Sequence, residues 1–293
     1  MLIIYHADCF DGAAAAWALW DVYRDAKFCP ATYGDAPPDV TGENVIIADF
    51  SYDPEVLVEM CKTAEKVTVI DHHETAIAKI DAYFNEHPFP VNLDLRLDIK
   101  RSGCGLAWDI AHHQNPTRPM IIDLIEDHDL WNFNLSMTRP FIAGLATMPI
   151  SIETIDKVFT DLDAVIAIGE PLVEMENSQI NRHLAESFPM FYCDPSVRHP
   201  SFTNEDLTGF CQEIRMTNCP RYHGSRVGEA MCKLFEVPFS ITYYDDEKWR
   251  YFRLRSIKGV GPDVSVIASK FGGGGHTHAA SFKRPRPDLF KEV

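Results

Sequence analysis

Short runs of apolar and β-branched residues alternate with longer stretches of helical periodicity over the first 75 residues. The apolar runs end at polar clusters and predict buried strands at Leu2 to Tyr5, Phe28 to Tyr33, Asn44 to Phe50 and Val67 to Ile70. Helices are expected between them, at Gly12 to Arg24 and from Pro54 to about Glu65. This alternation is typical of βαβ units, so we expect an α/β fold with a parallel sheet.

The pattern after these strands is first helical and then mixed. Helices are expected at Ser102 to His113, Pro119 to Trp131, Ser151 to Ile168 and Pro171 to Phe188, the last two being amphipathic. Proline and aspartate around Cys193 to Pro200 indicate a boundary. Beyond it we expect strands at Phe239 to Tyr244 and Tyr251 to Ser256 and a helix at Val264 to Lys270. We therefore divide the 293 residues into a parallel-sheet domain (1–150), a helical linker (151–195) and a smaller mixed α/β domain (196–293).

Composition narrows the class of partner. Lys and Arg total 27 against 43 Asp and Glu, and the formal net charge of -16 disfavours a positive surface for long duplex nucleic acid. The eight cysteines contain no C-x-x-C pair, so we expect reduced thiols rather than a zinc ribbon or a disulfide framework. No stretch approaches about 18 consecutive apolar residues, and the start lacks a basic segment followed by a long apolar run. We expect a cytoplasmic protein without a membrane partner.

Acidic and imidazole side chains gather where three of the predicted strands end. They are His6, Asp8 and Asp11 after the first strand, Asp49 after the third, and Asp71, His72 and His73 after the fourth. Ligands of open α/β sheets bind at the carboxyl ends of the strands, so these residues are expected to be neighbours. Carboxylates and imidazoles suit Mn²⁺ or Mg²⁺.

Three of these residues also have a structural explanation. Asp11 is equally well explained as a helix cap, His6 as a core histidine, and Asp49 as a cap or a solvent contact. The D-H-H triplet is different, because an acid and two imidazoles at the end of a buried strand are costly to desolvate without a partner. The triplet therefore favours a ligand or a catalyst.

Further candidates lie beyond the strand ends. The helix expected to end in E-D-H-D offers Asp127 as a further acidic ligand. His128 and Asp129 are alternatives to it, and a solvated helix end is the ordinary explanation of this charged run.

The C-terminal part contains the run F-G-G-G-G-H-T-H-A-A. Its glycines would let a phosphate approach backbone N–H groups beside His276, although glycines alone indicate only a flexible turn. Arg253 and Arg255 would share one strand face, where they meet either phosphates or solvent, and Arg255 is the one we retain as a substrate-binding candidate.

Together, D-H-H at 71–73 and G-G-G-G-H-x-x-A-A at 272–280 resemble the DHH phosphoesterase superfamily with its DHH-associated C-terminal domain. The resemblance covers nearly the whole chain in the expected order. It implies a parallel α/β catalytic domain, a helical linker and a smaller mixed substrate-binding domain, with the active site in the cleft between the domains. It also implies two Mn²⁺ ions, with Mg²⁺ or Co²⁺ as substitutes.

The resemblance also assigns roles to individual residues. It makes His6 and Asp8 ligands of one metal, Asp11 and His72 ligands of the other, Asp49 the bridge between them, and Asp127 the fourth acidic motif. Asp71 would orient His72, while His73 would support the ligands or act on the substrate. Gly273, Gly274, Gly275 and His276 would hold the phosphate. His73 and His276 are also the catalytic candidates for stabilising charge or assisting the departing oxygen.

Two positions depart from the pattern of this superfamily. Many relatives place the second and third ligands of the first motif two residues apart, whereas Asp8 and Asp11 are three apart, so either the loop bulges at Phe10 or Asp8 is displaced. Ser281 stands where many members have glycine, a small change that should leave the loop usable.

These features lead us to expect a manganese-dependent phosphodiesterase that hydrolyses short oligonucleotides, as nanoRNases or 3′-5′ exonucleases do, through a water activated by two metals. The expected partner is a short single-stranded oligonucleotide or a nucleotide, and homodimerisation stays open. The enzymatic alternatives are an inorganic polyphosphatase or pyrophosphatase and a phosphohydrolase of cyclic dinucleotides or 3′-phosphorylated nucleotides. A non-catalytic nucleotide sensor would have lost ligands, whereas each motif here retains one.

Overall fold

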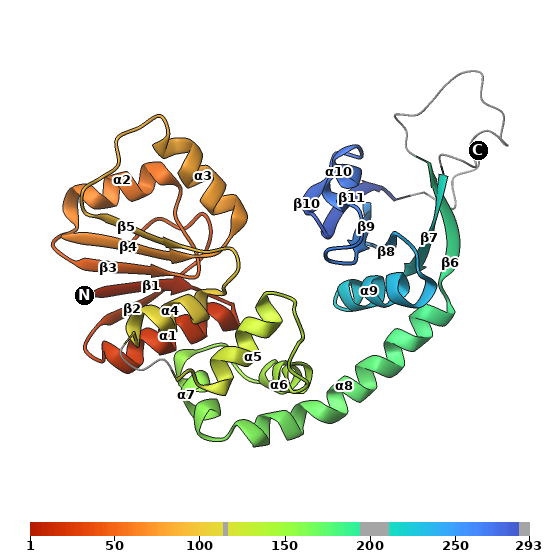
Figure 1. Ribbon diagram of the computed structural model, residues 1–293, viewed down its shortest axis with the longest axis horizontal. Coiled ribbons are helices and arrows are strands. Elements are labelled where there is room, and N and C mark those ends of the chain that lie inside the picture. Colours follow the sequence, from red (N-terminus) through yellow and green to blue (C-terminus); the bar gives the residue numbers. More distant parts are fainter. Residues whose placement is uncertain (114–116, 194–210, 287–293) are drawn as a thin grey trace. The chain divides into compact units, whose positions relative to one another are not determined.

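A computed structural model of the protein describes residues 1–113, 117–193 and 211–286. The chain divides into two compact units, Met1–Glu174 (unit 1) and Met175–Val293 (unit 2). Helix α8 (Leu162–Ala185) begins in unit 1 and continues into unit 2, and it is the long green helix of Figure 1. The two units therefore share one continuous element of secondary structure.

Unit 1 alternates strands and helices before it becomes helical. Its elements before α8 are β1 (Leu2–His6), α1 (Phe10–Val22), β2 (Lys27–Ala31), β3 (Asn44–Ala48), α2 (Pro54–Thr63), β4 (Lys66–Asp71), α3 (Glu74–Phe84), β5 (Leu93–Leu97), α4 (Gly103–Ala111), α5 (Met120–Asp129), α6 (Thr138–Leu145) and α7 (Ile152–Thr160). The four strands predicted in this part are all present. The sequence pattern did not predict α3, β5 or α6.

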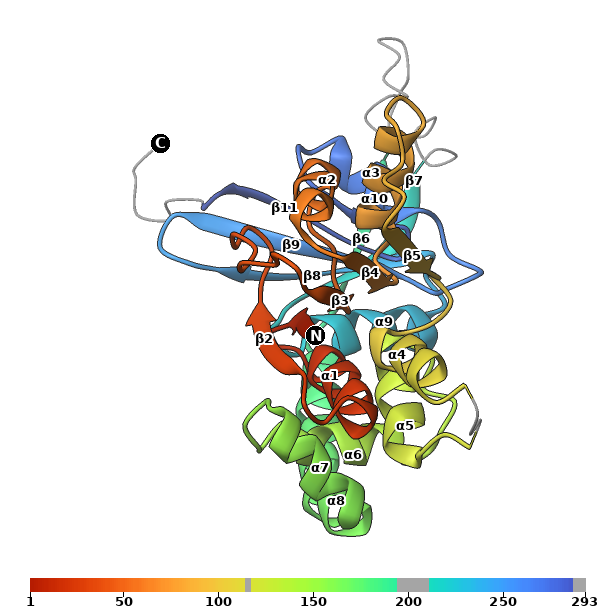
Figure 2. The ribbon, with the colours of Figure 1, turned by 90° about the vertical axis from the view of Figure 1, so that its left-hand side faces the viewer.

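Within the described residues of unit 1, five strands form a parallel sheet in the order β2-β1-β3-β4-β5. Successive side chains point to opposite faces, so Ile3 and Ile70 pack into one hydrophobic core while Ile4 and Val69 pack into the other. Figures 1 and 2 show α1 and α4 over the first face and α2 and α3 over the second. The sheet is buried on both faces, which explains the nearly continuous apolar runs and confirms the predicted fold class.

The strand order places a crevice at one edge of this sheet. From β1, the next strand in sequence, β2, lies on one side and β3 lies on the other. The strand order therefore reverses between β1 and β3. In α/β sheets, ligands bind beside the carboxyl ends of the two strands at such a reversal. The histidines and aspartates predicted from the sequence follow β1, β3 and β4.

Unit 2 is built on a mixed sheet. Its elements after α8 are β6 (Phe188–Cys193), β7 (Cys211–Asn218), α9 (Gly224–Phe235), β8 (Phe239–Asp245), β9 (Trp249–Ser256), α10 (Val264–Ser269), β10 (Gly274–His276) and β11 (Ala279–Pro285). Among the described residues the strand order is β10-β11-β9-β8-β7-β6, with β7 and β8 parallel and the other neighbours antiparallel. The mixed α/β character expected for the C-terminal part is confirmed.

The helical segment between the two sheets differs from the prediction. We expected two helices that meet near Pro171, but the first ends at Thr160 and α8 runs through the proline. The break is set by caps, because Ser151 Oγ accepts from the Thr154 amide (3.1 Å) at the start of α7 and Asp161 accepts from the Ala164 amide (3.2 Å) at the start of α8. An internal proline removes a hydrogen bond and can kink a helix without ending it.

The domain limits at residues 150 and 195 remain predictions. The proline-rich segment in which the second limit was expected lies, from residue 194 onward, outside the described residues. Within the described ranges, no helix is both long enough and apolar enough to cross a membrane.

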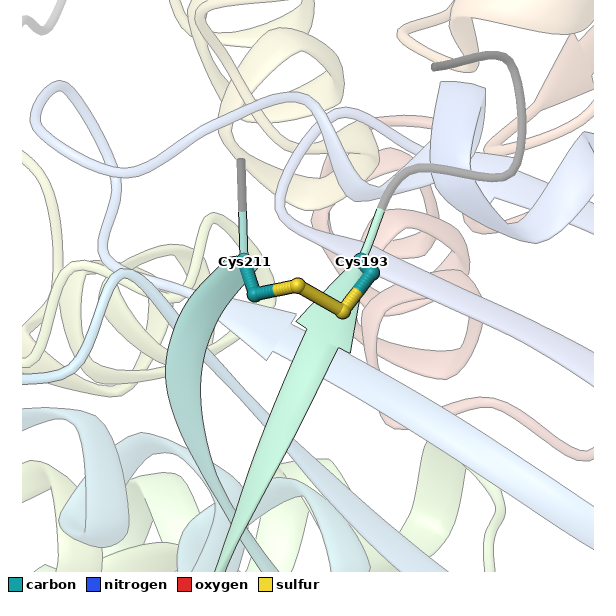
Figure 3. Close-up of a disulfide and its surroundings, with 2 residues drawn as sticks. All are labelled: Cys193 and Cys211. Carbon is teal, nitrogen blue, oxygen red and sulfur yellow. A yellow bond between two sulfur atoms is a disulfide. The ribbon is translucent and has the colours of Figure 1, made fainter. Parts of the chain in front are cut away.

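A disulfide joins Cys193 at the end of β6 to Cys211 at the start of β7 (Figure 3). The two residues face each other in the antiparallel pair, which brings their Cα atoms to 4.2 Å. The expectation of eight reduced thiols is therefore wrong for this pair. The spacing of 18 residues carries no motif, because cross-strand pairing rather than local sequence brings the two thiols together.

We expect the disulfide to stabilise unit 2 by about 3 kcal/mol, since it closes a chain segment in the unfolded state. Denaturant unfolding with and without reductant measures this difference. The control is the double variant Cys193→Ser/Cys211→Ser, whose stability should not respond to reductant. Eight alkylatable thiols in the unfolded, unreduced protein would contradict the assignment.

Candidate metal centre

Three strand ends bring the candidate residues together. His6 is the last residue of β1, Asp49 follows β3, and Asp71 ends β4. Asp49 has a left-handed backbone (φ 63°), and its amide donates to the Ile70 carbonyl at 2.9 Å. Aspartate tolerates this conformation better than most residues, and such backbone strain gathers at functional sites. The turn at Asp49 keeps its side chain at the sheet edge.

The carboxylate of Asp49 lies between two histidines. Its Oδ1 is 3.1 Å from His72 Nε2, and its Oδ2 is 3.4 Å from His6 Nδ1. Asp49 is 1% exposed, so its negative charge is almost completely removed from water. Each carboxylate oxygen faces a different imidazole, which is the arrangement that a ligand shared by two cations requires.

Asp11 is held at the same place by two helices. It lies in the first turn of α1, and its carboxylate accepts hydrogen bonds from the Gly103 amide (2.6 Å) and the Cys104 amide (2.9 Å) at the start of α4. The N-terminal amides and dipole of α4 favour a negative charge there. Asp11 Oδ2 is also 3.6 Å from His72 Nε2. Asp11 therefore links the sheet edge to α4 rather than capping its own helix, for which no side-chain cap bond is made.

Two glycines allow this close approach. A Cβ atom on Gly103 would lie 2.5 Å from Asp49 Cβ, and one on Gly12 would lie 2.9 Å from His6 Cβ. Both distances are far below ordinary van der Waals contact. Glycine at these two positions lets α4 and α1 reach the residues at the ends of β3 and β1.

The structure distinguishes Asp129 from Asp127. Asp129 Oδ2 is 3.6 Å from His72 Nε2, so Asp129 joins the cluster. Asp127 instead accepts from the amides of Asn134 (2.8 Å) and Leu135 (3.1 Å) and from the Thr138 hydroxyl. The Asp127 carboxylate thus stabilises the turn after α5, and the geometry favours Asp129 for the fourth acidic position.

Asp71 contacts a different ring from the one expected. Its Oδ1 accepts from the backbone amide of His72 (2.7 Å) and lies 2.7 Å from Nδ1 of His73. Asp71 therefore positions the His73 ring, whereas for His72 it fixes only the backbone. Since Nδ1 of His73 is engaged, its Nε2 is the nitrogen left for other partners.

Cys9, rather than the predicted ligand Asp8, lies beside His6 and Asp49. Asp8 is exposed, has φ 55°, and belongs to none of the groups of potential ligands found among the described residues. Cys9 belongs to one of these groups, together with His6 and Asp49. Burial together with the charges of Asp49 and Asp11 raises the pKa of the Cys9 thiol, so it stays protonated here. The three-residue spacing of Asp8 and Asp11 was the sequence signal of this displacement.

The electrostatics of the cluster favour a cation. Burial lowers the pKa of His72, but its hydrogen bond with Asp49 and the charges of Asp11 and Asp129 outweigh this and raise it to about 9. Burial and the neighbouring carboxylates of Asp49 and Asp129 raise the pKa of Asp11. Protons on Asp11 and His72 therefore take the place of a cation, and a divalent ion would relieve the same repulsion.

Two unsatisfied atoms support the fit of a metal. His6 Nδ1 and Asp49 Oδ2 are both buried and lie 3.4 Å apart, yet neither makes a hydrogen bond, to the other or to any other described residue. Buried polar atoms of this kind are rare and costly. Hard carboxylate oxygens with imidazole nitrogens form a donor set suited to Mn²⁺ or a similar ion, and the residues that would hold it are His6, Asp11, Asp49, His72 and Asp129.

The glycine run lies in unit 2 and forms a β-hairpin. Strand β10 pairs with β11, and a Cβ atom on Gly273 or Gly275 would lie within 2.6 Å of atoms of β11. A Cβ atom on Gly274 would meet nothing within 4 Å, and the φ of Gly274 is not positive. The hairpin therefore explains two of the glycines, while Gly274 is left as a position where a ligand can approach the backbone.

The other candidates of unit 2 lie around this hairpin. His276 is exposed, whereas His278 is held by Ser256 Oγ (2.8 Å) and has a structural role. Arg255 is half-buried, and its guanidinium donates to Ser225 Oγ (2.5 Å) in the first turn of α9. Whether these residues meet a phosphate remains a prediction.

Comparison of the sequence with known proteins finds one uncharacterized relative and no family. No protein-family model matches the chain. An uncharacterized protein, R106, of Acanthamoeba polyphaga mimivirus is 24% identical, and the match covers 95% of this chain and 66% of that protein. The chain thus spans slightly less than two thirds of that relative's length.

Two solved structures match the chain over most of its length. The pGpG-specific phosphodiesterase PggH from Vibrio cholerae superimposes with a TM-score of 0.57 at 14% identity, over 97% of this chain and 92% of that chain. An uncharacterized protein from Helicobacter pylori G27 gives a TM-score of 0.41 at 12% identity over 100% of this chain and 94% of that one. The first likeness shows a shared fold, a parallel-sheet unit followed by a mixed one.

Substitution of the two rival aspartates should separate their roles. We expect Asp127→Ala to destabilise metal-free unit 1 by about 2 kcal/mol, because a charged acceptor of three hydrogen bonds is lost. Asp129→Ala should change stability little, because burial and Asp49 raise the pKa of Asp129 and make its charge unfavourable. Denaturant unfolding in chelator measures both variants. Equal destabilisation would contradict the distinction.

Proposed function

We propose that the protein is a metal-dependent phosphodiesterase that hydrolyses short oligonucleotides. The observation that carries the proposal is the geometry of Asp49, whose two oxygens face His6 and His72 while Asp11 and Asp129 surround His72. The D-H-H and glycine-histidine motifs support the same reading. The fold shared with a pGpG-specific phosphodiesterase is consistent with it.

The proposed mechanism rests on side chains of unit 1. When bound, two Mn²⁺ ions would supply Lewis acidity to a phosphoryl oxygen and lower the pKa of a water. Asp49 would serve both ions, with His6 on one side and Asp11, His72 and Asp129 on the other. The amides of α4 hold Asp11 in place, so that this ligand needs no rearrangement.

His73 is the proposed proton carrier. Burial lowers the pKa of His73, but the hydrogen bond with Asp71 outweighs it and raises the value. A protonated imidazole with a free Nε2 can donate to the departing oxygen, as a general acid must. His276, Arg255 and the backbone at Gly274 are the proposed contacts to the substrate phosphates.

The proposed substrate is short. The net charge of -16 opposes adsorption of long nucleic acid, so phosphates must be met by local groups. Labelled RNA and DNA dinucleotides to hexanucleotides, cyclic dinucleotides and polyphosphate, each tested with Mn²⁺ and with chelator, identify the substrate class. Hydrolysis of polyphosphate alone would favour an inorganic phosphatase instead.

We expect Asp49→Ala and His72→Ala each to reduce Mn²⁺-dependent hydrolysis of a dinucleotide at least about 1,000-fold. Each variant lacks a proposed metal ligand, and the ions would stabilise the charge that develops in the transition state. Steady-state kinetics of folded variants measures the loss. Asp94→Ala is the control, since Asp94 lies on β5 in an exposed ion pair with Lys66. Unchanged hydrolysis in Asp49→Ala would contradict the proposed function.

The glycine hairpin gives a second test. Gly274→Ala should fold with unchanged stability, because its Cβ atom meets no protein atom, yet it should raise KM if the backbone contacts phosphate. Gly275→Ala should lower stability, because its Cβ atom would lie 2.6 Å from Ala280 Cα and its φ is 145°. Melting temperature and KM of both variants distinguish the two effects. A wild-type KM in Gly274→Ala would exclude the contact.

A further inference from the structure

A cavity of about 220 Å³ lies beside the candidate metal centre within unit 1. It is formed between the segment that follows β3 and the first turns of α3, and its lining includes Tyr33, Ser51, Tyr52, Asp53, Thr75 and Lys79. None of these residues belongs to the metal cluster. The cavity occupies the carboxyl edge of the sheet, where α/β folds bind their ligands.

Tyr33 connects the cavity to the metal cluster. Its ring packs edge-on against His6, with centroids 5.3 Å apart, and against His73, with centroids 6.0 Å apart. Tyr33 is nevertheless 54% exposed, so part of its surface is open to a ligand. Tyr33 therefore lines the cavity and also contacts His6 and His73.

The charges of the cavity favour a neutral ligand. Lys79 Nζ lies 2.7 Å from Asp53 Oδ1, so the positive charge of Lys79 is neutralised by a carboxylate that also lines the cavity. A phosphate would meet this carboxylate as well as the acidic metal cluster. A neutral group with both donors and acceptors can instead use the Asp53 carboxylate, the Lys79 ammonium and the Thr75 hydroxyl.

Tyr52 supplies a separate observation. It is 7% exposed, and its hydroxyl has no hydrogen-bond partner among the described residues. Buried hydroxyls are normally satisfied, since an unpaired one costs free energy. Because Tyr52 lines the cavity, a polar ligand there can provide the missing partner after a small shift of the side chain.

We propose that this cavity holds one nucleobase of the substrate, with Tyr33 as the stacking surface and Tyr52, Asp53 and Lys79 as the polar groups that read the base edge. The proposal rests on the proposed oligonucleotide hydrolysis. The volume lies below the roughly 300–1,000 Å³ of sites for drug-sized ligands, so it suits one ring system rather than a dinucleotide. The base in the cavity would orient its phosphate toward His73 and the metal cluster.

The test compares KM for an RNA dinucleotide with KM for its two singly abasic analogues. Tyr33→Ala should raise KM for the dinucleotide on the order of tenfold, which is the scale of losing one base–aromatic stack. It should leave KM unchanged for the analogue that lacks the base bound in the cavity. Tyr33→Phe should restore stacking and a near wild-type KM. Tyr83→Ala, which alters a tyrosine at the far end of α3, is the control.

The polar wall is tested with a matched pair of lysines. Lys79→Met should change the preference among the four bases, and Tyr52→Phe should raise KM for the preferred base. Lys66→Met should do neither, because Lys66 forms a comparable exposed ion pair with Asp94 at the opposite end of β4.

The outcomes separate this inference from the proposed function. Intact hydrolysis with wild-type KM in both Tyr33→Ala and Tyr52→Phe would overturn the base site and leave the function standing. If the wild-type protein hydrolyses no dinucleotide, calorimetric titration with guanosine, adenosine, cytidine and uridine tests whether the cavity binds a nucleobase. Nucleoside binding that weakens in Tyr33→Ala but not in Tyr83→Ala supports the site, whereas absent or unaltered binding rejects it.

Discussion

The site depends on one buried carboxylate placed between two imidazoles. Burial raises the pKa of Asp49, yet the neighbouring rings of His6 and His72 bring it below its usual value, so the charge is retained inside the protein. That charge is sustained only because β1, β3 and β4 end at the same level of a parallel sheet. The strand register, the two core layers and the approach of α4 all serve to keep these three side chains together.

Strand ends set the site, but helices complete it. The first amides of α4 hold Asp11, and the last residue of α5, Asp129, approaches His72. On another side of the cluster, the Tyr33 ring packs edge-on against His6 and also lines the neighbouring cavity. The candidate ligand residues therefore lie on strand ends and helices, whereas the aromatic ring beside them lies on a loop.

The sequence predicted the sheet edge better than the helix ends. His6, Asp49 and the D-H-H triplet stand at the ends of short, nearly continuous apolar runs that alternate with helical stretches, so their convergence follows from parallel strand pairing. The choice between Asp127 and Asp129 depends on the turn after α5, in which three donors capture Asp127, and no periodicity reports that. The pairing of Cys193 with Cys211 likewise depends on strand register across 18 residues.

Gly12 and Gly103 contribute no ligand atom, yet each allows a helix to approach a cluster residue closely. Surveys of chemically reactive residues would overlook both. Anyone who transfers this geometry to another parallel sheet must reproduce two missing methyl groups as faithfully as the aspartates and histidines, because the empty volume is itself part of the binding architecture.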